Sequence, residues 1–140
     1  MDLTRKEKKI LLVDDDPDIT IVFKLALEDS GFIVDTYQDP SVALSKFKPN
    51  SYGLVILDIR MPGMNGFELH KELQKIDPQL IFCFISADAI YYDEVISRAG
   101  DKRGKEEQYS TLNRERFLQK PISNVDLVKR IDEMMMRNSS

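Results

Sequence analysis

Several short apolar runs of the sequence end at polar side chains whose types could do chemistry together. The group contains four carboxylates, one hydroxyl and one ammonium. Its members are Asp14, Asp15 and Asp16 after residues 10–13, Asp58 after residues 54–57, Ser86 after residues 80–85, and Lys120 soon after a short run near residues 116–118.

If the apolar runs are parallel strands, their polar ends converge on one crevice, where Asp14, Asp15 and Asp58 would form a tight carboxylate cluster. Such a cluster repels itself and raises its own pKa values. Mg²⁺, or Mn²⁺ in its place, would remove the repulsion, since both ions suit oxygen ligands. Lys120 adds a point charge, and the Ser86 hydroxyl can donate to a phosphoryl oxygen. The set predicts phosphoryl transfer to a carboxylate, with Asp58 as the nucleophile.

The apolar runs alternate with helical patterns along the chain. Runs that are apolar on both faces predict strands of a parallel sheet that is covered by helices on each side. Five such units predict an α/β, doubly wound fold. The predicted strands cover residues 10–13, 32–37, 54–57, 80–85 and about 116–118.

Capping signals predict where three of the helices begin. Asp16 and Asp39 each precede a proline, so each is expected to cap the helix that follows it. Ser123 with Asp126 predicts a capping box for the last helix. A further helix is predicted over residues 91–98.

Apolar residues at helical spacing predict which side chains face the core. His70, beside two charged residues, is expected on the surface, and Cys83 is expected to be a buried, inert thiol. The three methionines 134–136 are expected to be core filler near a fraying end. The predicted core positions of three helices are Ile19, Val22, Phe23 and Ala26, then Leu69, Leu73 and Ile76, then Val125, Val128, Ile131 and Met135.

The composition predicts one ordinary globular domain. The chain has 140 residues, of which 42% are hydrophobic and 31% charged, as is usual for a single domain. Its net charge of -4 makes nucleic acid an unexpected partner. The sequence shows no membrane span and no signal peptide, so we expect a cytoplasmic protein.

Four segments carry specific motifs: residues 10–17 (ILLVDDDP), 57–66 (LDIRMPGMNG), 86–87 (SA) and 117–121 (FLQKP). Together they resemble the receiver domain of two-component response regulators, over about residues 10–136. The resemblance implies a flavodoxin-like sheet of strand order 2-1-3-4-5. It also implies one domain over residues 1–140, with a core at about 8–137.

The resemblance implies a role for each acidic site residue. Asp15 would hold Mg²⁺ directly and Asp14 largely through water, while the backbone carbonyl of Arg60 would be a further ligand. Asp58 would also contact the metal and accept the phosphoryl group. The donor would be a phosphohistidine on a sensor histidine kinase or phosphotransfer protein.

The resemblance also implies a switch. Ser86 and Lys120 would contact the phosphoryl group, and the peptide bond between Lys120 and Pro121 would be cis. Ser86 would move toward the added oxygens, and Phe117 would turn into the space that it leaves. The surface of the fourth helix, fifth strand and fifth helix would then control an output protein, with the receiver a monomer or a phosphorylation-dependent dimer.

Two features depart from the family pattern. Residues 102–113 look like an insertion beside the signalling face, which is either a longer solvated loop or a partner-docking element. The resemblance implies that Arg60 and Asp88, two residues after Asp58 and after Ser86, occupy variable positions that tune how fast water attacks the phosphoryl group. An ion pair between them would hinder an in-line water.

The predicted function is a stand-alone signalling switch that catalyses its own phosphorylation and slow hydrolysis but acts on no metabolite. One alternative is an aspartyl-phosphate phosphatase of related fold, although that chemistry needs an acid where this chain has Arg60. Another is a docking module that works without phosphorylation, against which the full set of site residues argues. A DNA-binding regulator is disfavoured, because only residues 138–140 follow the last predicted helix.

Overall fold

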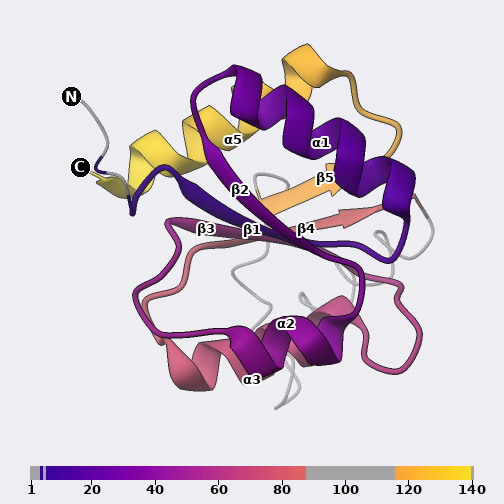
Figure 1. The fold of residues 1–140 in the computed structure, drawn as a ribbon. Helices are drawn as coiled ribbons and strands as arrows, with labels where there is room; N and C mark the ends of the chain where they lie inside the picture. Colours follow the sequence, from indigo (N-terminus) through magenta and orange to yellow (C-terminus); the bar gives the residue numbers. More distant parts are fainter. Residues whose placement is uncertain (1–3, 5, 88–115, 140) are drawn as a thin grey trace, which may run out of the picture.

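Parallel strands form one sheet in the computed structural model, which describes residues 4, 6–87 and 116–139. In this described part the sheet has five strands in the order β2-β1-β3-β4-β5 (Figure 1). The predicted flavodoxin-like order is therefore confirmed, and each strand bound lies within two residues of its prediction. The strands are β1 (Lys9–Val13), β2 (Ile33–Tyr37), β3 (Leu54–Asp58), β4 (Phe82–Ser86) and β5 (Phe117–Gln119).

Helices cover both faces of the sheet (Figure 1). One face carries α1 (Pro17–Asp29) and α5 (Asn124–Ser139), and the other carries α2 (Pro40–Lys46) and α3 (Gly66–Ile76). None of the helices in the described residues has both the length and the apolar character that a membrane crossing needs. The predicted helix over residues 91–98, the insertion at 102–113 and Asp88 lie outside the described residues.

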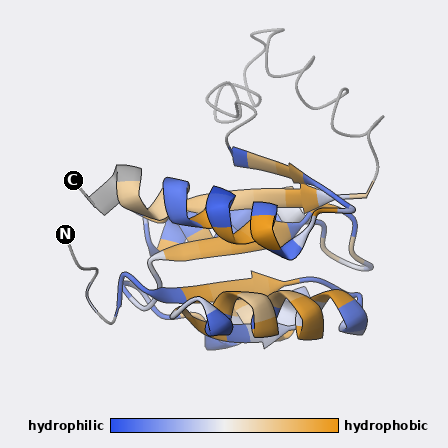
Figure 2. Ribbon diagram, turned by 90° about the horizontal axis from the view of Figure 1, so that it is seen from above, coloured by the Kyte–Doolittle hydropathy of each residue, from blue (hydrophilic) through white to orange (hydrophobic). Residues whose placement is uncertain are grey.

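Alternate residues of each strand enter different cores, because side chains point to opposite faces of a sheet. In β1, Ile10 and Leu12 belong to the core under α1 and α5, whereas Leu11 and Val13 belong to the core above α2 and α3. The strands are coloured as hydrophobic over most of their length in Figure 2. Burial on both faces leaves the strand ends as the places where polar side chains can gather.

The helix starts follow the capping signals of the sequence. Asp16 accepts a hydrogen bond from the backbone N–H of Asp18, and Asp39 caps α2 in the same way. The Ser123 hydroxyl accepts from the backbone N–H of Asp126 at 3.1 Å, next to the first residue of α5. These three predicted helix starts are confirmed.

The predicted inward faces of the helices are wrong at three positions. Val22 is 45% exposed, Ile76 is 38% exposed and Val125 is 77% exposed. In α1 the buried face instead contains Thr20, Phe23 and Leu27. The error is one of helical phase, because several apolar stripes fit one helix and only the neighbouring elements select among them. Met134 and Met135 are buried, as predicted, whereas Met136 is 39% exposed and is not core filler.

His70 is buried, so the prediction of a surface position is wrong. Its exposed fraction is 1%, and its ring lies 3.8 Å from the Phe82 ring and 5.6 Å from the Phe84 ring, measured between centroids. The aromatic side chains of β4 thus cover a histidine that the charged residues beside it in sequence suggested to be solvated. Cys83 is buried as predicted, and burial raises the pKa of its thiol to about 12, which is consistent with an inert thiol.

We expect the substitution His70→Phe to make the fold less sensitive to acid. Burial lowers the pKa of the imidazole from 6.5 to about 4. Below pH 6.5 the unfolded chain therefore binds a proton that the folded chain does not, and stability is lost as the pH falls toward 4. Between about pH 7 and pH 5, the free energy of unfolding should fall by roughly 2 kcal/mol more in the native chain than in the variant.

Urea unfolding followed by circular dichroism measures this difference. Lys71→Ala changes the exposed neighbour on the same helix, so it should keep the pH profile of the native chain. Equal losses of stability in the native chain and in His70→Phe would contradict the assignment of acid sensitivity to His70.

Candidate functional site

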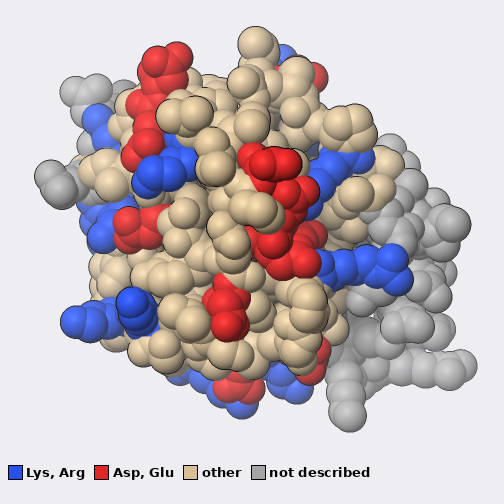
Figure 3. Space-filling view, turned by 45° about the vertical axis from the view of Figure 1, so that its right-hand side comes forward, with Lys and Arg blue, Asp and Glu red and all other residues tan. Residues whose placement is uncertain are grey.

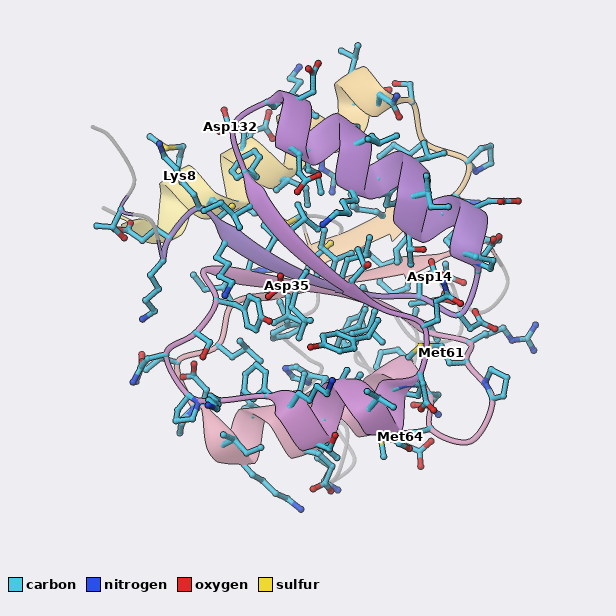
Figure 4. All side chains as sticks on the ribbon, in the orientation of Figure 1. Lys8, Asp14, Asp35, Met61, Met64 and Asp132 are labelled. Carbon is cyan, nitrogen blue, oxygen red and sulfur yellow. The ribbon has the colours of Figure 1, made fainter. Side chains whose placement is uncertain are left out.

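Neighbouring strands deliver the predicted site residues to one end of the sheet. Asp14 directly follows β1, Asp58 ends β3, Ser86 ends β4 and Lys120 directly follows β5. These four strands lie side by side in the sheet, and Asp14 lies at the carboxyl end of the strands, near the start of α1 (Figure 4). The predicted crevice therefore exists at the carboxyl ends of the strands.

Backbone hydrogen bonds extend the strand ladders into the site. The N–H of Asp14 donates to the carbonyl of Tyr37 at 3.1 Å, and the N–H of Lys120 donates to the carbonyl of Ser86 at 2.8 Å. The backbone of Asp58 is in register with Ile85 of β4. Because these bonds fix the backbone, the site side chains start from defined positions.

Three carboxylates meet in this crevice. One oxygen from each of Asp14, Asp15 and Asp58 lies within 4.8 Å of the others. Asp14 is fully buried and Asp58 is 5% exposed, whereas Asp15 is exposed. Further exposed acids follow at Asp16 and at Asp18, and Figure 3 shows acidic side chains gathered on the face that it draws.

Asp14 is held at both of its carboxylate oxygens. Oδ1 accepts a hydrogen bond from the backbone N–H of Asp16 at 2.9 Å, and Asp16 itself caps α1. Oδ2 lies 2.7 Å from Nζ of Lys120. The start of α1 and the end of β5 therefore share one buried carboxylate.

Lys120 is the cation that the described structure places among the acids. Its Nζ lies 3.8 Å from Oδ1 of Asp58, farther than from Asp14. Its side chain is 14% exposed, so this ion pair is screened less by water than a surface pair. The ammonium of Lys120 thus lies close to both buried carboxylates of the cluster.

The pKa of Asp58 is raised from 3.8 to about 8. The largest cause is burial, which disfavours the charged form, and the negative charge of Asp14 adds to it. Lys120 opposes the rise, while a hydrogen bond and the charge of Asp15 favour it further. A divalent cation among these oxygens would remove the main charge repulsion, so the three carboxylates fit such an ion.

The predicted switch residues lie on β4, which pairs with the strand of Asp58, and on β5, which pairs with β4. Ser86 is 2% exposed at the end of β4, and Phe117 is 4% exposed at the start of β5. The rings of Phe117 and Phe84 lie 6.4 Å apart between centroids. The peptide bond between Lys120 and Pro121 is cis, as expected. Phe117 therefore already lies in the core, and its rotation on phosphorylation stays a prediction.

Arg60 is exposed on the loop that follows β3. Its proposed partner Asp88 lies outside the described residues, so the ion pair between them also stays a prediction. The start of α3 was not predicted from the sequence. There Asn65 and Glu68 form a reciprocal capping box, and the Asn-x-x-Glu spacing could have revealed it.

Comparison with known proteins agrees with this arrangement. Residues 10–132 match the family model described as response regulator receiver domain. The regulatory protein VanRB of Enterococcus faecalis is 33% identical over 132 residues, which cover 94% of this chain and 54% of that protein. The transcriptional regulatory protein CpxR homolog of Haemophilus influenzae is 34% identical over 132 residues, which cover 94% of this chain and 52% of that protein.

Solved structures show the same fold. The response regulator protein TrrA from Thermotoga maritima, solved in complex with Mg²⁺ and BeF, superposes with a TM-score of 0.69 at 26% identity. The match covers 90% of this chain and 97% of that one. By contrast, the chain spans about half the length of the two curated relatives above.

We expect Asp58→Asn to stabilise the metal-free protein at alkaline pH. The folded chain holds a proton on Asp58 up to about pH 8, so the native chain loses stability as the pH rises from about 4 to 8. The uncharged amide avoids this loss. In a chelator at about pH 8, the variant should unfold roughly 5 °C or more above the native chain, and the gap should shrink at about pH 5.

Thermal unfolding followed by circular dichroism checks this, with Asp29→Asn as an exposed control at the far end of α1. Added Mg²⁺ should raise the melting temperature of the native chain more than that of Asp58→Asn. If the difference in melting temperature between the native chain and Asp58→Asn is the same at both pH values, the raised pKa of Asp58 is contradicted.

Lys120→Met should strongly destabilise the metal-free protein. The substitution leaves the buried carboxylate of Asp14 without the ammonium that lies 2.7 Å from it, at a cost of roughly 2 to 4 kcal/mol. Lys75→Met is the matched control, because its ammonium pairs with Glu72 at the surface and should contribute less than about 1 kcal/mol. Chemical denaturation of both variants in chelator compares the costs, and similar values would show that Lys120 is not part of a buried ion pair.

Proposed function

The chain belongs to the family of response regulator receiver domains, and from this premise we propose that it is a phosphorelay switch with Asp58 as the phosphoacceptor. One observation carries the proposal: the carboxylate of Asp58 is buried beside Asp14, Asp15 and the ammonium of Lys120. An acceptor of a phosphoryl group needs a positioned nucleophile and neutralisation of charge, and these side chains can supply both.

Asp14, Asp15 and Asp58 are the side chains that would hold Mg²⁺, with the backbone carbonyl of Arg60 as a proposed fourth ligand. The ion would neutralise charge on the phosphoryl oxygens. Asp58 has to be ionised in order to attack, yet its pKa in the metal-free protein is about 8. The metal-free chain should therefore be a poor acceptor at neutral pH, which supports a requirement for a divalent cation.

The proposed donor is a phosphohistidine of a sensor kinase or phosphotransfer protein. An oxygen of Asp58 attacks the phosphorus, the new O–P bond forms as the P–N bond breaks, and the donor histidine takes up a proton. Lys120, already 3.8 Å from Asp58, would pair with the incoming phosphoryl oxygens, and Ser86 would donate a hydrogen bond to them. In the slow return step, a water oxygen attacks the phosphorus, the bond between the phosphorus and the Asp58 oxygen breaks, and inorganic phosphate leaves while Asp58 returns to its carboxylate form.

The output would be a change of surface around β5 and α5. Phosphorylation adds negative charge next to Lys120 and Ser86, and Phe117 lies two residues from the end of β5. A ring that changes position there alters the surface that a partner protein contacts. We propose that the protein acts in this way in the cytoplasm, and that it turns over no metabolite.

Incubation with acetyl phosphate tests the proposal. Asp58 would attack the phosphorus and acetate would leave, so the native chain should gain the mass of one phosphoryl group when Mg²⁺ is present. The gain should be lost in chelator and in Asp58→Asn, and it should persist in Asp29→Asn, which changes an exposed carboxylate. Intact-mass spectrometry measures each case, and no gain in the native chain with Mg²⁺ would overturn the proposal in favour of a docking module.

A further inference from the structure

We infer that Gly66 is a positioning residue for the phosphoacceptor, and that a side chain at this position would displace Asp58 from its productive geometry. The inference rests on the proposed function and adds a residue that makes no contact with the phosphoryl group itself. Gly66 is the first residue of α3 and is buried.

The space around Gly66 is closed by the backbone of Asp58. An ideal Cβ on Gly66 would lie 2.3 Å from the carbonyl oxygen of Asp58, 3.0 Å from its carbonyl carbon and 3.1 Å from Cα of Ile59. A backbone carbonyl cannot rotate away as the end of a flexible side chain can. Among the described glycines, Gly31 and Gly63 have positive φ, so space rather than backbone conformation explains the absence of a side chain at Gly66.

The segment that a Cβ would push is held on its other side. The N–H of Gly66 donates to the carbonyl of Ile59 at 2.9 Å, and the N–H of Ile59 donates to the carbonyl of Ile85 in β4 at 3.0 Å. The peptide between Asp58 and Ile59 thus lies between β4 and the first turn of α3. A methyl group on residue 66 must displace either α3 or this peptide. Because the loop that contains Arg60 joins the two, either displacement also moves that loop.

Phosphoryl transfer is sensitive to such a movement. A misplacement of about 1 Å in a reacting group can cost about 100-fold in rate. The carboxylate of Asp58 is the proposed nucleophile, and the carbonyl of Arg60 is a proposed metal ligand two residues later. Displacement of their shared backbone would therefore lower the rate of attack and weaken the binding of Mg²⁺.

Gly53 provides a matched control next to the opposite end of β3. It directly precedes β3, whereas Asp58 ends it. An ideal Cβ on Gly53 would also lie 2.3 Å from a backbone carbonyl oxygen, that of Glu7, and its N–H also donates to a backbone carbonyl, that of Lys9 at 2.8 Å. Gly53→Ala should therefore strain the fold to a similar degree, at the end of the sheet that lies away from the site.

The experiment compares the native chain, Gly66→Ala and Gly53→Ala in the acetyl phosphate reaction. Initial rates are measured over a range of acetyl phosphate at saturating Mg²⁺, and Mg²⁺ binding is measured by isothermal titration calorimetry. In Gly66→Ala the maximal rate should fall roughly 10-fold or more, and the dissociation constant for Mg²⁺ should rise. In Gly53→Ala the maximal rate should stay within about 2-fold of the native value, despite a similar loss of thermal stability.

The reactions are run at about 10 °C in trimethylamine N-oxide, which favours the compact state, and circular dichroism shows which chains are folded. Equal maximal rates in Gly66→Ala and Gly53→Ala would overturn the positioning role while leaving the proposed function intact. A Gly66→Ala chain that stays unfolded when Gly53→Ala is folded would assign Gly66 to folding and overturn it as well. A native chain that gains no phosphate would overturn the proposed function, and the positioning role with it.

Discussion

The structure depends on the electrostatic cost of gathering carboxylates at the end of a buried sheet. Asp14 has no exposed surface, Asp58 has little, and the ammonium of Lys120 lies near both of them. Burial first, and then the negative charge of Asp14, raises the pKa of Asp58, and the ammonium of Lys120 opposes this rise only in part. An incompletely neutralised cluster favours whatever adds positive charge or removes negative charge, so the same imbalance that weakens the metal-free fold favours a divalent cation.

Only a rigid backbone can hold like charges this close. The apolar strands supply the rigidity, because burial on both faces and parallel ladders fix where each strand ends. Local bonds then complete the site: Asp14 accepts from the N–H of Asp16, which caps α1, and the N–H of Lys120 donates to the carbonyl of Ser86. Asp14 and Lys120, which bear charge in the site, therefore also hold the start of α1 and the end of β5 in place. A change of charge in the site can thus affect the positions of α1 and β5.

The sequence was sufficient for the features that local chemistry determines. Apolar runs with polar ends predicted the strands and the members of the site, and capping side chains predicted the starts of α1, α2 and α5. The sequence was insufficient where elements that are distant in the chain decide which side chains are buried. Val22 and Val125 are exposed because packing selects the helical phase, and His70 is buried because Phe82 and Phe84, which come later in the chain, cover it. The Asp58 carbonyl closes the space that a side chain at Gly66 would need, which is also a tertiary feature that only the three-dimensional structure reveals.

β5 has a site residue next to one end and a hydrogen bond to α5 at the other. Lys120, whose ammonium lies close to Asp14 and Asp58, directly follows this three-residue strand, and Phe117 is the first residue of the strand. The carbonyl of Phe117 accepts a hydrogen bond from Nη2 of Arg130 on α5 at 3.3 Å. Proximity alone does not transmit a signal, since coupling needs an element with two arrangements that the site biases. β5 is the described element best suited to that role. Next to one end of this strand the N–H of Lys120 donates to the carbonyl of Ser86, and at the other end the carbonyl of Phe117 accepts from Arg130 of α5.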